Sequence, residues 1–280
     1  MVNKEFNFED IRAYIDQHND SAYKDFLCTA NPLLNKNPFV TSFYKDDFLK
    51  EKRCLSGLSK IKILLIYYLK TSIQMTLFLG NWTLLGWKQK SEIPEVLIDT
   101  FFVVNNIIKE NSYKERYLPG LEKILKEKNH SYAYLPRWYS AKNPLKVRHA
   151  QKILKDRNIP FINIYAFVTI KDVIILFYWL IKYPFSILKW KKSISISTFR
   201  DEIFVVALYE SLTTTTIDAY FRYLIAGKLA GSQNLKRIYS WSEGQLVDRL
   251  FYKGLKEGNS NAQVYGCQLF LQAKKQTYTI

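Results

Sequence analysis

The segment 236–268 has the pattern of a strand, a turn, a helix and a second strand, and this order constrains the fold more than any other feature. A β-prone run, Arg237–Trp241, ends at a turn, and a helical pattern with one apolar stripe follows it. A second β-prone run covers 262–266. Strands joined through a helix pair in parallel, and ligands bind beyond the carboxyl ends of such strands. Glu243 and Gln268 follow the two strands and are therefore candidate ligand-binding residues.

The same alternation of strand and helix patterns extends back to about Ile93. It predicts an α/β fold, a Rossmann-like parallel sheet flanked by helices over residues 93–280. Residues 1–92 are predicted to form a mainly helical N-terminal region, with Asn7 as the cap of its first helix. The further predicted strands are 96–104, 132–135 and 160–166, and the further predicted helices are 118–128, 145–156, 170–181 (ending near Pro184), 198–211 and 217–230.

An excess of positive charge favours anionic partners. The 280 residues include 41 Lys and Arg against 25 Asp and Glu, which gives a net charge of +16. Nucleic acid, anionic lipid and the phosphates of nucleotide sugars are all compatible with this charge. No nucleic-acid recognition motif accompanies it, so nucleic acid is not expected as a partner, and a basic nucleic-acid-binding protein is the weakest alternative.

Metal and cofactor chemistry is not indicated by the sequence. The three cysteines lack metal-ligand spacing and are too few for a disulfide framework, and the three histidines are scattered. Neither a glycine-rich phosphate loop nor a Gly-x-Ser-x-Gly nucleophile motif is present. We therefore expect no metal and no cofactor, and a reducing, cytoplasmic setting.

Two long stretches, Lys52–Ser91 and Val173–Arg200, contain no acidic residue and combine lysines with aromatic residues. This mixture suits contact with an anionic membrane surface, and a buried helix with a solvated basic edge is the alternative. Neither stretch is expected to span a bilayer, because the longest uncharged run, Thr71–Trp87, falls short of about 20 apolar residues. The predicted membrane contacts are Lys182, Lys189, Trp190, Lys191 and Lys192.

Three short segments carry a family resemblance. The first is Glu243-Gly244-Gln245 followed by Asp248-Arg249 and Gly254-Leu255, the second is Val264-Tyr265-Gly266-Cys267-Gln268, and the third is Arg116-Tyr117-Leu118-Pro119-Gly120-Leu121 running into Tyr134-Leu135. Together they cover about residues 96–268 and resemble bacterial surface-carbohydrate biosynthesis proteins, glycosyltransferase-like enzymes of the two-Rossmann-domain (GT-B) type. The resemblance implies capsule or lipopolysaccharide assembly by a cytoplasmic protein that is peripheral on the inner membrane.

The chain departs from this family pattern after Gln268. The family usually has a histidine there, and this chain continues with Leu269-Phe270-Leu271-Gln272 and ends at Ile280. The second Rossmann domain, which holds most of the nucleotide-sugar donor site in the family, has no counterpart in the sequence. We therefore expect an acceptor-side half, with a nucleotide-sugar donor as partner only if a second domain is supplied. A lipid-linked or oligosaccharide acceptor is the other expected partner.

The resemblance also implies roles for individual residues. Glu243 is the candidate catalytic base or acceptor-binding group, while Gln245 and Gln268 are expected to hydrogen-bond a sugar. Arg249 is expected to orient Glu243 or to meet a phosphate. The alternative for Glu243 is a carboxylate favoured by the helix dipole at the start of a helix, with Arg249 in a surface ion pair.

Arg137 and Trp138, which follow the predicted strand 132–135, are candidates for stacking on a sugar ring, and a loop anchor is their alternative. Two functional alternatives remain besides an enzyme acting on a glycan. One is a non-catalytic glycan-binding or partner-binding remnant that acts as a scaffold, and the other is the basic nucleic-acid binder considered above.

Overall fold

A computed structural model describes residues 57–86, 92–139, 143–193, 215–242, 246–258 and 261–267, together with 195, 197 and 212. The predictions for residues 1–56, including the helix capped by Asn7, lie outside these residues, as does the predicted helix 198–211. Glu243, Gln245 and Gln268 also lie outside them.

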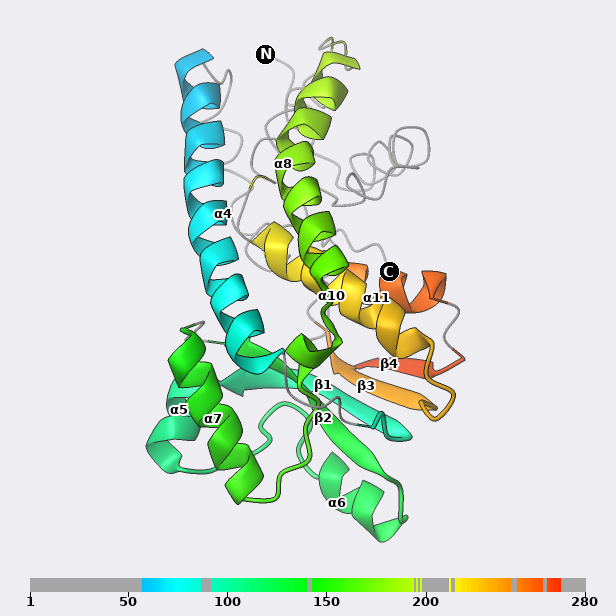
Figure 1. The fold of residues 1–280 in the computed structure, drawn as a ribbon. Coiled ribbons are helices and arrows are strands. Elements are labelled where there is room, and N and C mark those ends of the chain that lie inside the picture. Colours follow the sequence, from blue (N-terminus) through cyan, green and yellow to red (C-terminus); the bar gives the residue numbers. More distant parts are fainter. Residues whose placement is uncertain are drawn as a thin grey trace, which may run out of the picture.

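In the described part of the chain, the centre of the fold is a four-stranded, entirely parallel sheet with strand order β2-β1-β3-β4 (Figure 1). The strands are β1 Val96–Val103, β2 Tyr132–Tyr139, β3 Arg237–Trp241 and β4 Gln263–Cys267. Apart from Asp99 and Thr100, strand β1 is apolar, and it is almost wholly buried, as expected for a central strand with helices on both faces. The predicted α/β, Rossmann-like class, with a helical segment before the sheet, is therefore confirmed.

Helices flank the sheet. Helices α10 and α11 pack together against one face, while α5 and α7 pack together on the other (Figure 1). Two long helices, α4 and α8, extend away from the sheet side by side, and buried residues of both belong to the same core as the strands. The helices are α4 Gly57–Leu85, α5 Val104–Glu110, α6 Leu121–Glu127, α7 Pro144–Asp156, the short 3₁₀ helix η3 Ile164–Phe167, α8 Ile170–Ser193, α10 Thr215–Ala230 and α11 Leu246–Glu257.

The prediction of a strand at 160–166 is wrong. Only Phe161 forms a bridge, to Tyr134 of β2, and the chain then turns into η3. The Asn163 side chain explains the turn, because its amide donates a hydrogen bond of 2.8 Å to the backbone carbonyl of Leu85 at the end of α4. A helix end needs partners for its last carbonyls, and Asn163 supplies one from a neighbouring segment.

The prediction that the helix beginning at residue 170 ends near Pro184 is also wrong, because α8 continues to Ser193. A proline inside a helix has no N–H, so the carbonyl four residues earlier loses its usual donor. That carbonyl belongs to Leu180, and the buried hydroxyl of Tyr67 on α4 donates to it at 3.0 Å. Tyr67 thus compensates for Pro184 and attaches α4 to α8.

Removal of this hydroxyl is expected to destabilise the protein. We expect Tyr67→Phe to lower the free energy of unfolding by about 1–3 kcal/mol, because it leaves the Leu180 carbonyl buried without a donor. In a Pro184→Ala background, which restores the N–H, the loss should fall below about 1 kcal/mol. Urea denaturation of the single and double variants measures this coupling. Equal losses in both backgrounds would refute the compensation.

Helix α4 is the described helix that has the length and composition to cross a membrane, over Ile61–Leu85. The sequence-based expectation counted only the uncharged run from Thr71, whereas the helix extends further toward its N-terminus and includes Lys62 and Lys70.

Candidate functional site

A buried network of charges occupies the middle of the sheet. Asp99 lies in β1 with no exposed surface, and the guanidinium of Arg137, in β2, donates to both of its carboxylate oxygens. Arg222 donates to Asp99 from α10 at 2.7 Å, and the second amino group of Arg137 donates to Asp248 of α11 at 2.5 Å. Ser240, the β3 partner of Asp99 in the register, donates its hydroxyl to the same carboxylate at 2.7 Å. Two aspartates therefore balance two arginines.

The network lies where the strand order reverses direction. Strand β2 is on one side of β1 and β3 is on the other, and in open α/β sheets the crevice between strands that diverge in this way is the usual ligand site. The side chains come from five elements, so the network fixes α10 and α11 relative to β1, β2 and β3. The close packing of α10 on α11 depends on Gly254 of α11, because a Cβ added there would lie 2.5 Å from the Tyr223 carbonyl oxygen of α10.

Burial by itself would raise the pKa of Asp99, but the charges and hydrogen bonds of Arg137 and Arg222 outweigh it and hold that pKa well below its usual range. Asp99 also raises the pKa of Arg137, against the effect of burial. Both groups therefore stay charged at neutral pH. A permanently ionised, fully paired carboxylate orients its neighbours and is unsuited to exchange a proton with a substrate.

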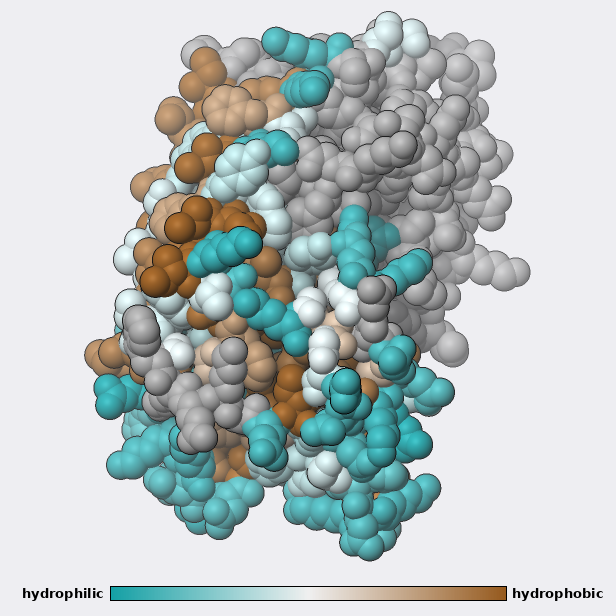
Figure 2. All heavy atoms as spheres, turned by 45° about the vertical axis from the view of Figure 1, so that its right-hand side comes forward, coloured by the Kyte–Doolittle hydropathy of each residue, from teal (hydrophilic) through white to brown (hydrophobic). Residues whose placement is uncertain are grey.

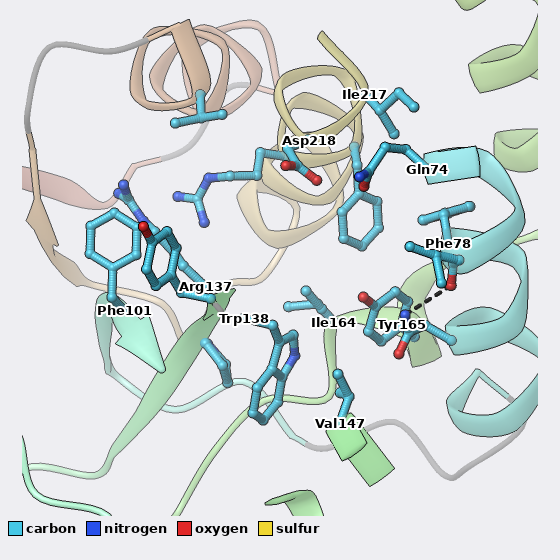
Figure 3. Close-up of a pocket in the computed structure, with 17 residues that line it drawn as sticks. Gln74, Phe78, Phe101, Arg137, Trp138, Val147, Ile164, Tyr165, Ile217 and Asp218 are labelled. Carbon is cyan, nitrogen blue, oxygen red and sulfur yellow. Dashed lines mark hydrogen bonds between the residues drawn. The ribbon is translucent and has the colours of Figure 1, made fainter. Parts of the chain in front are cut away.

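A cavity of about 290 Å³ adjoins this network at the carboxyl ends of β1 and β2 (Figure 3). Figure 3 shows Gln74 and Phe78 of α4 on one side, Phe101 and Arg137 from the strands on the other, and Asp218 from the first turn of α10 between them. The described lining residues are Gln74, Leu77, Phe78, Asn81, Phe101, Pro136, Arg137, Trp138, Tyr139, Val147, Ile164, Tyr165, Ile217, Asp218, Phe221, Arg222 and Val247.

The cavity combines aromatic rings with hydrogen-bonding groups. Burial, with a smaller contribution from the charge of Asp218, raises the pKa of Tyr165, so its hydroxyl remains a donor at neutral pH. The indole N–H of Trp138 and the Nε–H of Arg222 are buried and have no hydrogen-bond partner among the described residues. Buried N–H groups normally have a partner, so two such donors at one cavity need an explanation. An oxygen acceptor supplied by a buried water or by a ligand would provide it.

The structure places Arg137 and Trp138 inside β2, which continues to Tyr139 instead of ending at Leu135. They are therefore strand residues, and the expectation that they follow the strand is corrected. Arg137 engages Asp99 and Asp248, while the Trp138 ring packs on Phe102 and also lines the cavity. Arg249 is half-buried on α11 and does not line the cavity.

The predicted membrane contacts Lys182, Lys189, Lys191 and Lys192 all lie on α8. Lys189 and Lys192 are exposed, while Lys182 and Lys191 are half-buried, and the Lys182 ammonium lies 5.6 Å from the centre of the Tyr178 ring. Trp190 lies on the same helix, and its side chain is outside the described part of the structure.

Sequence reasoning missed most of the network and the cavity. It predicted a buried strand at 96–104, and Asp99 within that strand was a usable signal, since a charge in a buried strand requires a partner. Arg222 and Asp218 gave no such signal. Each lies in a helical pattern where a charged residue is ordinarily exposed, and only the packing of α10 brings them to the cavity.

Comparisons of the chain with protein-family models, with curated proteins and with solved structures found no match. Across the described ranges, no group of three or more His, Cys, Asp or Glu side chains is arranged to hold a metal ion.

Proposed function

We propose that this chain is a glycosyltransferase-like protein of bacterial surface polysaccharide assembly and that its sheet domain binds the glycan acceptor. The cavity at the carboxyl ends of β1 and β2 is the observation that carries this proposal. Its aromatic lining offers flat apolar faces for sugar rings, and the N–H donors of Trp138 and Arg222 suit sugar hydroxyl oxygens.

The motif resemblance supports the same function. Glu243 and Gln245 lie in the chain between the end of β3 at Trp241 and the start of α11 at Leu246, and Gln268 follows β4. In parallel sheets ligands bind beyond the carboxyl ends of the strands, and the cavity lies at the carboxyl ends of β1 and β2. Glu243 is proposed as the base that deprotonates the acceptor hydroxyl. The nucleotide-sugar donor would require a second domain in the same or another polypeptide.

A non-catalytic glycan-binding scaffold is the second candidate function, and one observation favours it. Asp218 is the only carboxylate among the described residues that line the cavity. Asp99 lies behind the lining and is paired with two arginines, so it is unsuited to act as a catalytic base. The two candidates share the glycan site and differ in turnover. Sugar transfer or donor hydrolysis by the chain, alone or with a partner domain, would favour the enzyme.

Isothermal titration of the full chain with a panel of bacterial oligosaccharides and nucleotide sugars tests the proposal. We expect saturable binding of at least one oligosaccharide, and loss of that binding in Gln74→Trp, which places a bulky ring in the cavity. Thr76→Trp is the matched control, since Thr76 is exposed on the same helix and does not line the cavity. No glycan binding across the panel, or unchanged affinity in Gln74→Trp, would exclude this cavity as the glycan site.

A further inference from the structure

The two long helices present an apolar surface that the fold leaves uncovered. The exposed apolar side chains include Ile61, Leu65, Ile66, Leu69 and Ile73 on α4, and Ile170, Ile174, Phe177, Tyr178, Ile181 and Phe185 on α8. We call these side chains the helix-pair face. Figure 2 shows apolar residues gathered over the long helices, while hydrophilic residues dominate the opposite end of the molecule. Within Ile61–Leu85 of α4, only 22% of the most apolar stretch is buried, whereas the core helix of a soluble protein is mostly buried.

The rows follow helical periodicity on both helices. Ile61, Leu65, Leu69 and Ile73 recur every four residues and point away from Tyr67 and Met75, which face the core. On α8 the exposed row is opposite Leu176 and Leu180. Such rows normally pack on another element. Many large apolar side chains exposed along the same two helices favour an interaction site.

The exposed charges of α4 and α8 indicate what kind of surface the helix-pair face would bind. Asp172 is the single acidic residue of α4 and α8, and it is nearly buried in an ion pair with Lys228 at 2.6 Å. The exposed charges of the two helices are therefore all positive. The exposed lysines are Lys62, Lys70, Lys171, Lys189 and Lys192. A surface of apolar side chains on helices whose exposed charges are all positive is complementary to a bilayer of anionic lipid.

Polar groups on α4 are compatible with this environment. The exposed hydroxyl of Thr76 donates to the carbonyl of Ser72 at 3.0 Å, and that of Thr83 donates to the carbonyl of Gly80 at 3.1 Å. Hydroxyls that bond back to their own helix enter an apolar medium at lower cost than free hydroxyls. We infer that the helix-pair face docks on an anionic membrane surface, with its apolar rows among the acyl chains and its lysines at the headgroups. This inference is independent of the glycan site.

Vesicle flotation of the full chain tests the inference. Vesicles of phosphatidylethanolamine with phosphatidylglycerol should bind the protein, those of phosphatidylcholine should bind it less, and salt should weaken binding. The variant Leu65→Ser/Leu69→Ser/Phe185→Ser should reduce the partition coefficient by roughly tenfold for each side chain withdrawn from the lipid. Lys189→Glu/Lys192→Glu should reduce it by about fivefold per lysine.

Leu145→Ser is the matched control, because Leu145 on α7 is 67% exposed and Leu65 and Leu69 are each 65% exposed. It should bind vesicles like the unmodified chain. Circular dichroism should show the same fold in every variant, since all these side chains are exposed. Absence of vesicle binding would overturn the inference, as would unchanged binding by the triple variant.

Two further outcomes would replace the inference with another. Retention in membranes after alkaline carbonate extraction would mean that α4 spans the bilayer instead of docking on it. A dimer that the triple variant dissociates, without vesicle binding, would make the face a contact between two copies of the chain.

Discussion

Asp99→Asn is expected to lower the free energy of unfolding by about 3–5 kcal/mol, because it leaves two buried arginines with a single carboxylate between them. Replacing both members of a buried pair with apolar residues can be neutral, but removing one leaves an uncompensated charge. Urea denaturation followed by circular dichroism measures the loss. Asp156→Asn, at the exposed end of α7, is the control and should change stability by less than about 0.5 kcal/mol.

The same substitution should change the acid sensitivity of the protein. The folded-state pKa of Asp99 lies below the unfolded value of about 3.9. Its contribution to stability is therefore fully present above that value and is lost as the pH falls below it. Stability should decrease between about pH 5 and pH 2 in the unmodified chain, and less steeply in Asp99→Asn. If Asp99→Asn lowered the free energy of unfolding by less than about 1 kcal/mol at neutral pH, Arg137 and Arg222 would have found other partners, contrary to the prediction.

Glu243→Ala is expected to reduce sugar transfer by roughly 10²–10⁴-fold, the usual contribution of a general base. The assay follows label from nucleotide sugars into a lipid-linked or oligosaccharide acceptor, with the enzyme complete or reconstituted with its donor domain. Glu257→Ala is the control, because it removes an exposed carboxylate from α11 at the end remote from Glu243. Its transfer rate should be unchanged.

Glycan titration separates the possible roles of Glu243. If Glu243 is the base, the variant should keep its affinity for the acceptor while transfer is lost, because only the transition state requires proton removal. Weaker glycan binding with transfer reduced in proportion would assign Glu243 to binding alone. Undiminished transfer would remove it from the mechanism.

The class of the fold was predictable because hydrophobic periodicity is a local signal. The run Val96–Val103 and the unit from Arg237 to Cys267 carry their strand and helix patterns within a few residues, and both were located to within a residue or two. The errors came from tertiary contacts. Asn163 caps a helix almost 80 residues earlier in the chain, and Tyr67 replaces the donor that Pro184 lacks more than 100 residues later.

The candidate site was predictable only in part, for the same physical reason. Arg137 and Trp138 were selected because they adjoin a predicted strand, and both line the cavity. The pairing of Asp99 with Arg222 depends on how α10 packs across the sheet, which no local pattern records. Exposure on the helix-pair face also depends on packing, because an apolar stripe in a sequence ordinarily indicates a buried side.

A crystal structure of the full chain with the oligosaccharide that binds most tightly is the most direct test of the glycan site. A sugar ring against Trp138, Tyr139 or Phe101, with a hydroxyl oxygen accepting from Trp138 or Arg222, is the predicted result. An oligosaccharide bound elsewhere, with the cavity at the carboxyl ends of β1 and β2 unoccupied, would contradict it.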